Sequence, residues 1–292
     1  TLKNVLLAAV LILYGGNLEA QEGPVQRFWA IYPKVEQGGT LVFQVSPYWM
    51  PPATSNPTIY IFEKHYRPNE KGTVFVGVGL DTEPGKYIAT FNENGLRSGW
   101  DYEEIEVLAV SSEKTRTSRY TGRPSARTDR QKRIIDGAFD NAMKSDGSVD
   151  LTGGLDYVDP LCFTLYINDP FGFIYRNNPY RTHEGVDLRA PVGMAVLAVN
   201  AGKVIMIARN FRREGNMVIL SHGLGIFSVY MHLSKFEVKL RDTVKRGQLI
   251  ALTGRTGAGI KRGDEHLHFS MKSHDSYVDP FEFIETVNQY LE

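Results

Sequence analysis

Short runs of strand-forming residues, separated by glycine and proline, constrain the fold of this chain more than any other feature of its sequence. In residues 40–46, Leu41, Phe43 and Val45 recur at every second position, as expected for a strand with one buried face. Similar runs follow at residues 58–63, 73–78 and 87–91. After Leu161 the strand pattern returns and continues to about Met271, without a strong helical period. We therefore predict an all-β protein.

The length of 292 residues predicts two domains, because one domain commonly holds about 150 residues. We predict an accessory β-sandwich, immunoglobulin-like in its general architecture, over residues 25–110. Residues 111–160 are predicted to be a basic linker with a short helix at 134–143. Residues 161–292 are predicted to form the second domain, with a short helix at 280–291.

Residues 1–20 have the composition of a signal peptide. Lys3 precedes an apolar run of about ten residues, and the segment ends on the small residue Ala20. A bilayer span needs roughly 20 apolar residues, so we predict cleavage, and an uncleaved anchor that tethers the protein is the alternative. We expect a protein exported to the periplasm or the extracellular space, with no stable membrane insertion after signal removal.

The balance of charges excludes a general nucleic-acid binder. The chain has 33 Lys plus Arg and 33 Asp plus Glu, so it lacks the positive field that such a protein needs. The basic run at 111–133 is predicted to be a solvated linker, and a contact with an anionic polymer or a membrane surface is the alternative. The only cysteine, Cys162, cannot form a disulfide within the chain. We expect a monomer whose metal site, if it has one, is built from histidines and carboxylates.

Six of the seven histidines lie in the second half of the chain. His183 and Asp187 are four residues apart, so on one strand both would point to the same side of the sheet. By the same rule, His266 and His268 share a face with Ser270. These two segments of the chain are therefore each predicted to place polar, metal-binding side chains opposite an apolar face.

A third segment extends this pattern. Alternation predicts that Ser228, Tyr230 and His232 share one face, and that Met231 points to the other. Burying several imidazoles and a carboxylate on a sheet is costly unless a ligand satisfies them, and a divalent metal does so. Neutral imidazole and carboxylate suit zinc, although other first-row metals also bind them.

Three motifs occur in a fixed order along this half of the chain: His183-Glu-Gly-Val-Asp187, Tyr230-Met-His232-Leu233 and His266-Leu-His268-Phe269. Shorter matches accompany them: Asp169-Pro-Phe-Gly172, Ala190-Pro-Val-Gly193, Val244-Lys-Arg-Gly247, Thr253-Gly254 and Val278-Asp279-Pro280. Together they resemble the lysostaphin-type (LytM-like) zinc metallopeptidases of bacterial peptidoglycan, over roughly residues 163–283. The N-terminal sandwich is similar to the accessory domain that precedes some of these peptidases.

The resemblance implies that His183, Asp187 and His268 bind one Zn2+ ion, and that His232 and His266 are catalytic histidines without a bond to the metal. It also implies a compact antiparallel β domain of the duplicated hybrid motif type, with a groove over the central sheet. Residues 257–265 depart from the shorter, proline-containing segment that usually precedes the His-x-His pair. This difference affects one wall of the groove and removes no ligand.

The function implied is an exported zinc endopeptidase that hydrolyses peptide bonds in peptidoglycan stems or cross-links with a metal-activated water. In this hypothesis His266 takes the proton of the water and His232 donates a hydrogen bond to the oxyanion, and the two roles can be exchanged. A catalytically silent, wall-binding regulator of other peptidoglycan hydrolases is the alternative. Sugar phosphotransfer by paired histidines is a third hypothesis, which the predicted signal peptide disfavours.

The remaining histidines have structural interpretations. We expect His65 and His274 to be exposed on the surface. His222 lies in a Ser-His-Gly sequence, and we expect a turn residue whose ring is satisfied by hydrogen bonds.

Overall fold

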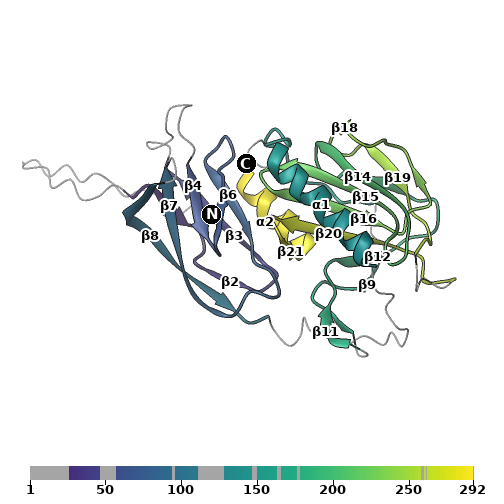
Figure 1. The fold of residues 1–292 in the computed structure, drawn as a ribbon, viewed down its shortest axis with the longest axis horizontal. Helices are drawn as coiled ribbons and strands as arrows, with labels where there is room; N and C mark the ends of the chain where they lie inside the picture. The colour runs from purple at the N-terminus through teal and green to yellow at the C-terminus, as the bar shows by residue number, and fades with distance from the viewer. Residues whose placement is uncertain are drawn as a thin grey trace, which may run out of the picture.

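The computed structural model describes residues 26–46, 57–93, 96–110, 128–146, 150–162, 166–175, 178–257, 260 and 262–291. The predicted signal peptide at 1–20 and most of the basic run at 111–133 lie outside these residues. The described chain is built mostly from strands, with two helices (Figure 1). The predicted all-β class is therefore confirmed. Neither described helix combines the length and the apolar character needed to cross a membrane.

The N-terminal half of the described chain folds into two sheets that share one apolar core. The first sheet has the order β1 (Phe28–Ala30), β3 (Thr40–Val45) and β6 (Thr73–Gly77). The second has the order β2 (Lys34–Glu36), β8 (Leu96–Leu108), β7 (Gly85–Glu93), β4 (Thr58–Ile61) and β5 (Lys64–Tyr66). Phe28 lies between Phe43 and Phe91, with ring centroids 6.0 and 6.1 Å away, and so joins the two sheets.

The predicted runs at 40–46, 58–63, 73–78 and 87–91 are confirmed as strands β3, β4, β6 and β7. The sequence did not predict β8, because acidic residues such as Glu103 and Glu104 interrupt its apolar pattern. The immunoglobulin-like type of this half, and the domain boundaries given above, remain predictions.

The C-terminal half is organised around a sheet of eight strands. Its order is β18 (Thr243–Val244), β14 (Gly202–Phe211), β15 (Gly215–Gly223), β16 (Ile226–Met231), β20 (His266–Ser273), β12 (Val186–Arg189) and β9 (Ile167–Asp169), with β21 (Ser276–Val278) also paired to β20. A smaller sheet has the order β13 (Ala195–Leu197), β19 (Leu249–Leu252) and β17 (Lys235–Phe236). A hairpin of β10 (Ile174–Tyr175) and β11 (Asn178–Thr182) precedes β12. All pairs in the large sheet are antiparallel.

The first helix, α1 (Asp129–Asp146), is longer than the predicted helix at 134–143. Thr128 and Gln131 cap the N-terminus of α1, because each side chain accepts a hydrogen bond from the other residue's backbone N–H. The helix lies across one side of the large sheet (Figure 1). Its buried residues Ile135, Phe139 and Ala142 pack on that side. The spacing of the apolar residues predicted the helix. It did not predict the start of the helix at Asp129, because the first turn consists of polar and charged residues.

The second helix, α2 (Pro280–Leu291), begins and ends as predicted. Asp279 caps it by accepting hydrogen bonds from the backbone N–H groups of Phe281 and Glu282 at 3.1 and 3.4 Å. Phe283, Val287 and Leu291 are buried on its inner face, at the spacing that the sequence predicts.

The register of the large sheet fixes which side chains share a face. Met231, Val229 and Phe227 of β16 lie directly opposite His268, Ser270 and Lys272 of β20. Residues opposite each other on antiparallel strands point to the same side. The side of the sheet that α1 covers is therefore also the side to which His268 points.

The two halves meet at the end of β20 remote from His268, and Gly38 of the N-terminal half also packs closely on Phe171. The carboxylate of Glu282 in α2 accepts hydrogen bonds from the backbone N–H and the hydroxyl of Thr40 at 3.2 and 2.9 Å. The hydroxyl of Ser273 accepts one from the Gly77 backbone at 3.2 Å. Lys64 pairs with Asp275 at 2.5 Å. These contacts hold the N-terminal sheets against β20, β21 and α2, at the opposite end of β20 from His268.

Candidate metal centre

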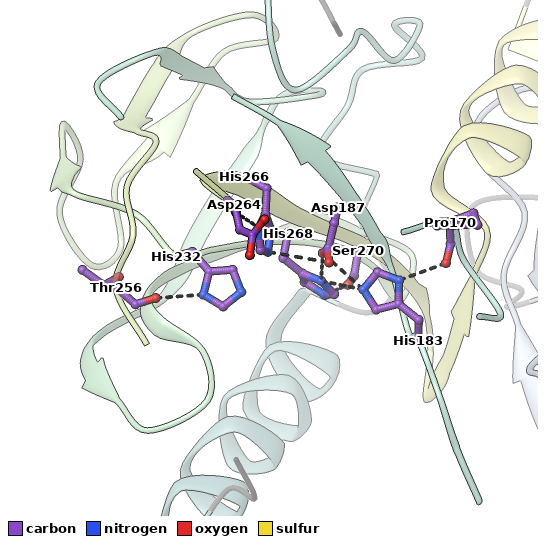
Figure 2. A network of polar contacts seen from close by, with 9 residues as sticks. All are labelled: Pro170, His183, Asp187, His232, Thr256, Asp264, His266, His268 and Ser270. Atoms are coloured by element: carbon purple, nitrogen blue, oxygen red, sulfur yellow. Dashed lines mark hydrogen bonds and ion pairs between the residues drawn. The ribbon is translucent and has the colours of Figure 1, made fainter. Parts of the chain in front are cut away.

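Three of the predicted site residues converge in the described part of the chain. One ligand atom from each of His183, Asp187 and His268 lies within 4.8 Å of the other two, and all three residues are buried. The separations are 3.0 Å from His183 Nε2 to His268 Nδ1, 3.2 Å from His183 Nε2 to Asp187 Oδ1, and 2.8 Å from His268 Nδ1 to Asp187 Oδ1. Figure 2 shows the three side chains pointing toward one another.

Strand pairing brings Asp187 and His268 together. They are direct partners in the register between β12 and β20, so their side chains lie side by side on one face. His183 approaches Asp187 and His268 from outside the regular strands. The prediction that His183 and Asp187 lie on one strand is wrong, because β12 begins only at Val186 and His183 precedes a bend.

The ring of His183 is oriented by a backbone carbonyl. Its Nδ1 lies 2.9 Å from the oxygen of Pro170, which can only accept, so Nδ1 carries the proton. Nε2 then keeps its lone pair and faces Asp187 and His268. This is the arrangement that a metal-binding imidazole requires.

The charges of the cluster are coupled. Burial lowers the pKa of the His183 ring, but the Asp187 carboxylate outweighs this effect and raises the pKa above its ordinary value. Burial raises the pKa of Asp187, whereas His183 and His266 together hold it well below the ordinary value. Burial lowers the pKa of His268 to about 4. Asp187 is therefore a carboxylate and His268 a neutral ring at neutral pH.

His266 lies next to this cluster and is partly exposed. Its Nδ1 donates a hydrogen bond of 2.7 Å to the carbonyl of Asp264, and its Nε2 lies 3.6 Å from Asp187 Oδ2. The centroid of its ring is 5.0 Å from that of His232 (Figure 2). The structure thus brings both predicted non-ligand histidines to one side of the three converging residues.

His232 reaches the site because β16 ends one residue before it. Its backbone has a φ of 65°, in the left-handed region, which breaks the strand alternation. Its Nδ1 donates a hydrogen bond of 2.9 Å to the carbonyl of Thr256. Burial lowers the pKa of the ring to about 3. His232 therefore lies on the side of Met231, with a neutral ring at neutral pH.

The prediction that Ser228 and Tyr230 share the face of His232 is wrong for the same reason. Both remain on the strand and point to the opposite side, where they are fully buried. Ser228 Oγ lies 2.8 Å from His222 Nε2 and 3.1 Å from the Tyr230 hydroxyl. These residues form a polar network inside the core, remote from the converging histidines.

The three other histidines are placed as follows. His65 is exposed, as predicted. His222 has a satisfied ring, as predicted, but lies within β15 rather than in a turn. The expectation that His274 is exposed is wrong, because its ring packs on Tyr66 with centroids 4.2 Å apart where the two halves of the chain meet.

Sequence reasoning missed the groups that orient the site. Pro170, Thr256 and Asp264 act through backbone carbonyls, which every residue type carries, so no side-chain pattern identifies them. Ser270 also contacts the site, with its hydroxyl 3.0 Å from His268 Nε2. The alternation along β20 placed Ser270 on the correct face, but no contact could be inferred.

The converging residues fit a metal ion. Two neutral imidazole nitrogens and a carboxylate oxygen are a donor set that zinc favours. Ligand atoms about 2.0–2.1 Å from a tetrahedral zinc lie about 3.3 Å from one another. The observed separations of 2.8–3.2 Å need only small outward movements of the side chains to match this value.

Comparisons with known proteins place this part of the chain in a peptidase family. Residues 181–280 match the model of peptidase family M23. This range of the chain contains the four histidines and the aspartate of the site. A metalloprotease of Haemophilus influenzae is 42% identical over 100 residues, which are 34% of this chain and 20% of that protein. The peptidoglycan DD-endopeptidase ShyB of Vibrio cholerae is 38% identical over 97 residues, 33% of this chain and 22% of that protein. The chain thus spans about a fifth of the length of these two relatives.

A solved structure extends the likeness beyond the matched residues. The crystal structure of a candidate M23 peptidase from Pseudomonas aeruginosa aligns with a TM-score of 0.63 and 26% identity. The alignment covers 85% of this chain and 94% of that one. The arrangement of both halves described above therefore has a counterpart in another protein.

Proposed function

Because residues 181–280 of this chain belong to peptidase family M23, we propose that the protein is a metal-dependent endopeptidase that hydrolyses peptide bonds in peptidoglycan. The observation that carries the proposal is the convergence of His183, Asp187 and His268 beside two further histidines. The relative in Vibrio cholerae is named a peptidoglycan DD-endopeptidase, which supports the choice of substrate.

His183, Asp187 and His268 would hold one zinc ion in this proposal. Each offers an unshared electron pair to the same point, through His183 Nε2, Asp187 Oδ1 and His268 Nδ1. A zinc ion held in this way polarises a carbonyl group and activates a water molecule. The buried surroundings of all three residues strengthen their electrostatic interactions with the ion.

His266 and His232 would transfer the protons of the hydrolysis reaction in this proposal. Each ring donates Nδ1–H to a backbone carbonyl, so each presents Nε2 to the site as a proton acceptor. We assign His266 as the general base, because it is partly exposed and its Nε2 faces the metal centre, 3.6 Å from Asp187 Oδ2. His232 is buried and faces His266, so it can receive the proton that His266 takes from the water and then donate a hydrogen bond from Nε2 to an oxyanion.

The cellular setting follows from the substrate. Peptidoglycan lies outside the cytoplasm, which agrees with the signal peptide predicted at 1–20 and with export to the periplasm or cell surface. The N-terminal half binds the Ser273 end of β20 and packs on Phe171, beside the Pro170 carbonyl that orients His183, so we propose that it supports the catalytic half rather than covers the site. We propose that the protein acts as a monomer.

The proposal is tested with purified peptidoglycan sacculi. Incubation with the wild-type protein should release new free amines, because hydrolysis of each peptide bond exposes one. A chelator should stop the release, and added zinc should restore it. The variant His266→Ala should release amines at least about a hundredfold more slowly. Release that continues unchanged in chelator would contradict the proposal.

A further inference from the structure

The two ring nitrogens of His268 face different partners. Nδ1 lies 2.8 Å from Asp187 Oδ1 and 3.0 Å from His183 Nε2, on the side where a metal would lie. Nε2 lies 3.0 Å from the hydroxyl of Ser270. His268 differs in this respect from His183, which points Nε2 to the centre and fixes Nδ1 on a carbonyl.

The tautomer of His268 decides whether it can bind a metal. A neutral imidazole carries one proton, so Nδ1 has a free lone pair only when the proton is on Nε2. Asp187 favours the other tautomer, since its carboxylate accepts a hydrogen bond from a protonated Nδ1. A hydrogen-bond acceptor at Nε2 is therefore required to favour the metal-binding form, and the Ser270 hydroxyl is positioned to be that acceptor.

Ser270 is held firmly in this position. It points to the same side of β20 as His268, opposite Val229 of β16, and is fully buried. The Ser270 side chain has no exposed surface, so bulk water does not reach its hydroxyl. Among the described residues, Ser270 thus supplies the hydroxyl at hydrogen-bond distance from His268 Nε2.

Gly185 packs against both His268 and Ser270. A Cβ atom at position 185 would lie 2.4 Å from Ser270 Oγ, 2.5 Å from the Phe269 carbonyl oxygen and 2.9 Å from His268 Nε2. Real Cβ atoms do not approach other atoms this closely. The segment that carries His183 and Asp187 thus packs directly on the His268–Ser270 hydrogen bond, and only glycine fits between them.

We propose that Ser270 is a positioning residue for the metal centre. It accepts a hydrogen bond from His268 Nε2–H, holds His268 in the tautomer with a free Nδ1, and so raises the affinity for the metal. Gly185 secures this bond by leaving space for it. The inference rests on the proposed function, since it concerns the same centre.

The experiment measures the dissociation constant of Zn2+ by competition with a chromophoric chelator, using full-length protein first stripped of metal. The variant Ser270→Ala should bind Zn2+ about 10–100-fold more weakly than wild type. Gly185→Ala, which leaves the hydroxyl in place but forces a methyl group onto the bond, should also weaken binding. Nitrogen NMR of the zinc-loaded wild type should show the proton of His268 on Nε2.

Ser228→Ala is the matched control. Ser228 is an equally buried serine on the neighbouring strand, and its hydroxyl lies 2.8 Å from Nε2 of His222, a histidine outside the metal centre. This variant should keep the wild-type dissociation constant within about twofold, because no residue of the centre is touched. Thermal unfolding of both serine variants shows how much general stability each has lost.

Two results would overturn the inference. Equal dissociation constants for wild type and Ser270→Ala would show that the hydroxyl does not position His268. Equal weakening in Ser270→Ala and Ser228→Ala would show only a general loss of stability. A wild-type protein that binds no Zn2+ at all would instead contradict the proposed function, so the two failures are distinguishable.

Discussion

At the scale of single residues, hydrogen bonds from ring Nδ1 to backbone carbonyls organise the chemistry. His183, His232 and His266 each use Nδ1 in this way and direct Nε2 toward the site. The sequence predicted these three residues but not the direction of their rings, because the acceptors are carbonyl groups that side-chain identity does not determine. Ring orientation, rather than the presence of histidine, distinguishes a site that can act on a substrate from a cluster of buried rings.

His222 shows what burial alone does to a histidine. Its ring is fully buried in the core, bonded to the Ala201 carbonyl and to Ser228, and burial lowers its pKa to about 4. The unfolded chain, with a pKa near 6.5, therefore binds more protons than the folded one between about pH 6.5 and 4. The stability that this neutral ring contributes is present above pH 6.5 and is lost as the pH falls through that range.

We accordingly predict that His222→Gln flattens the pH dependence of stability. The shift corresponds to at most about 3 kcal/mol, so the free energy of unfolding of the wild type should fall by up to that amount between pH 7 and 4 through this group alone. Urea unfolding of both proteins at pH 7, 5.5 and 4 measures the difference. A variant that loses as much stability on acidification as the wild type would refute the assignment to His222.

At the scale of secondary-structure elements, strand alternation predicted the site wherever the strand continued. It placed His266, His268 and Ser270 on one face, which β20 confirms. It failed where a strand ends, at His183 before β12 and at His232 after β16, since the alternation rule requires regular backbone. The left-handed φ of His232 depends on tertiary contacts of the Thr256 loop, which the local sequence does not encode.

Helix α1 is predicted to be an integral part of the catalytic half. Phe139 is buried and packs edge-on against Phe227 with ring centroids 5.0 Å apart, on the sheet face that carries His268. Phe139→Ala should therefore lower the free energy of unfolding by about 3 kcal/mol. The control Ile134→Ala, on the same helix but 44% exposed, should change it by less than about 0.5 kcal/mol. Equal effects of the two substitutions in chemical unfolding would show that α1 does not pack as described.

At the scale of the whole molecule, the two halves form one structure whose polar contacts lie at the Ser273 end of β20. Thr40, Lys64 and Gly77 of the N-terminal sheets bind Glu282, Asp275 and Ser273 of the C-terminal half. The sequence predicted two β domains but not their contact, because the contacting residues are ordinary polar side chains and glycines without a shared pattern. The closeness of Gly77 to Ser273 allows the contact to be tested.

A Cβ atom at position 77 would lie 2.7 Å from both Ser273 Cβ and Val278 Cγ1, so Gly77→Ala should force the halves apart locally. We expect a loss of about 1–3 kcal/mol in the free energy of unfolding. Gly137→Ala is the matched control, because a Cβ at this position of α1 meets no atom within 4 Å. It should stabilise the protein by about 0.5–1 kcal/mol through helix propensity. A neutral or stabilising Gly77→Ala would contradict the close packing of the two halves.

Metal analysis of purified variants tests the central claim most directly. Wild-type protein loaded with zinc and freed of excess metal should retain one ion per chain, measured by mass spectrometry of the dissolved metal. His268→Ala should retain none, because one of three ligands is lost, whereas His266→Ala should retain the ion and lose only activity. Zinc that remains at full stoichiometry in His268→Ala, or disappears in His266→Ala, would contradict the assignment of His183, Asp187 and His268 as the metal centre.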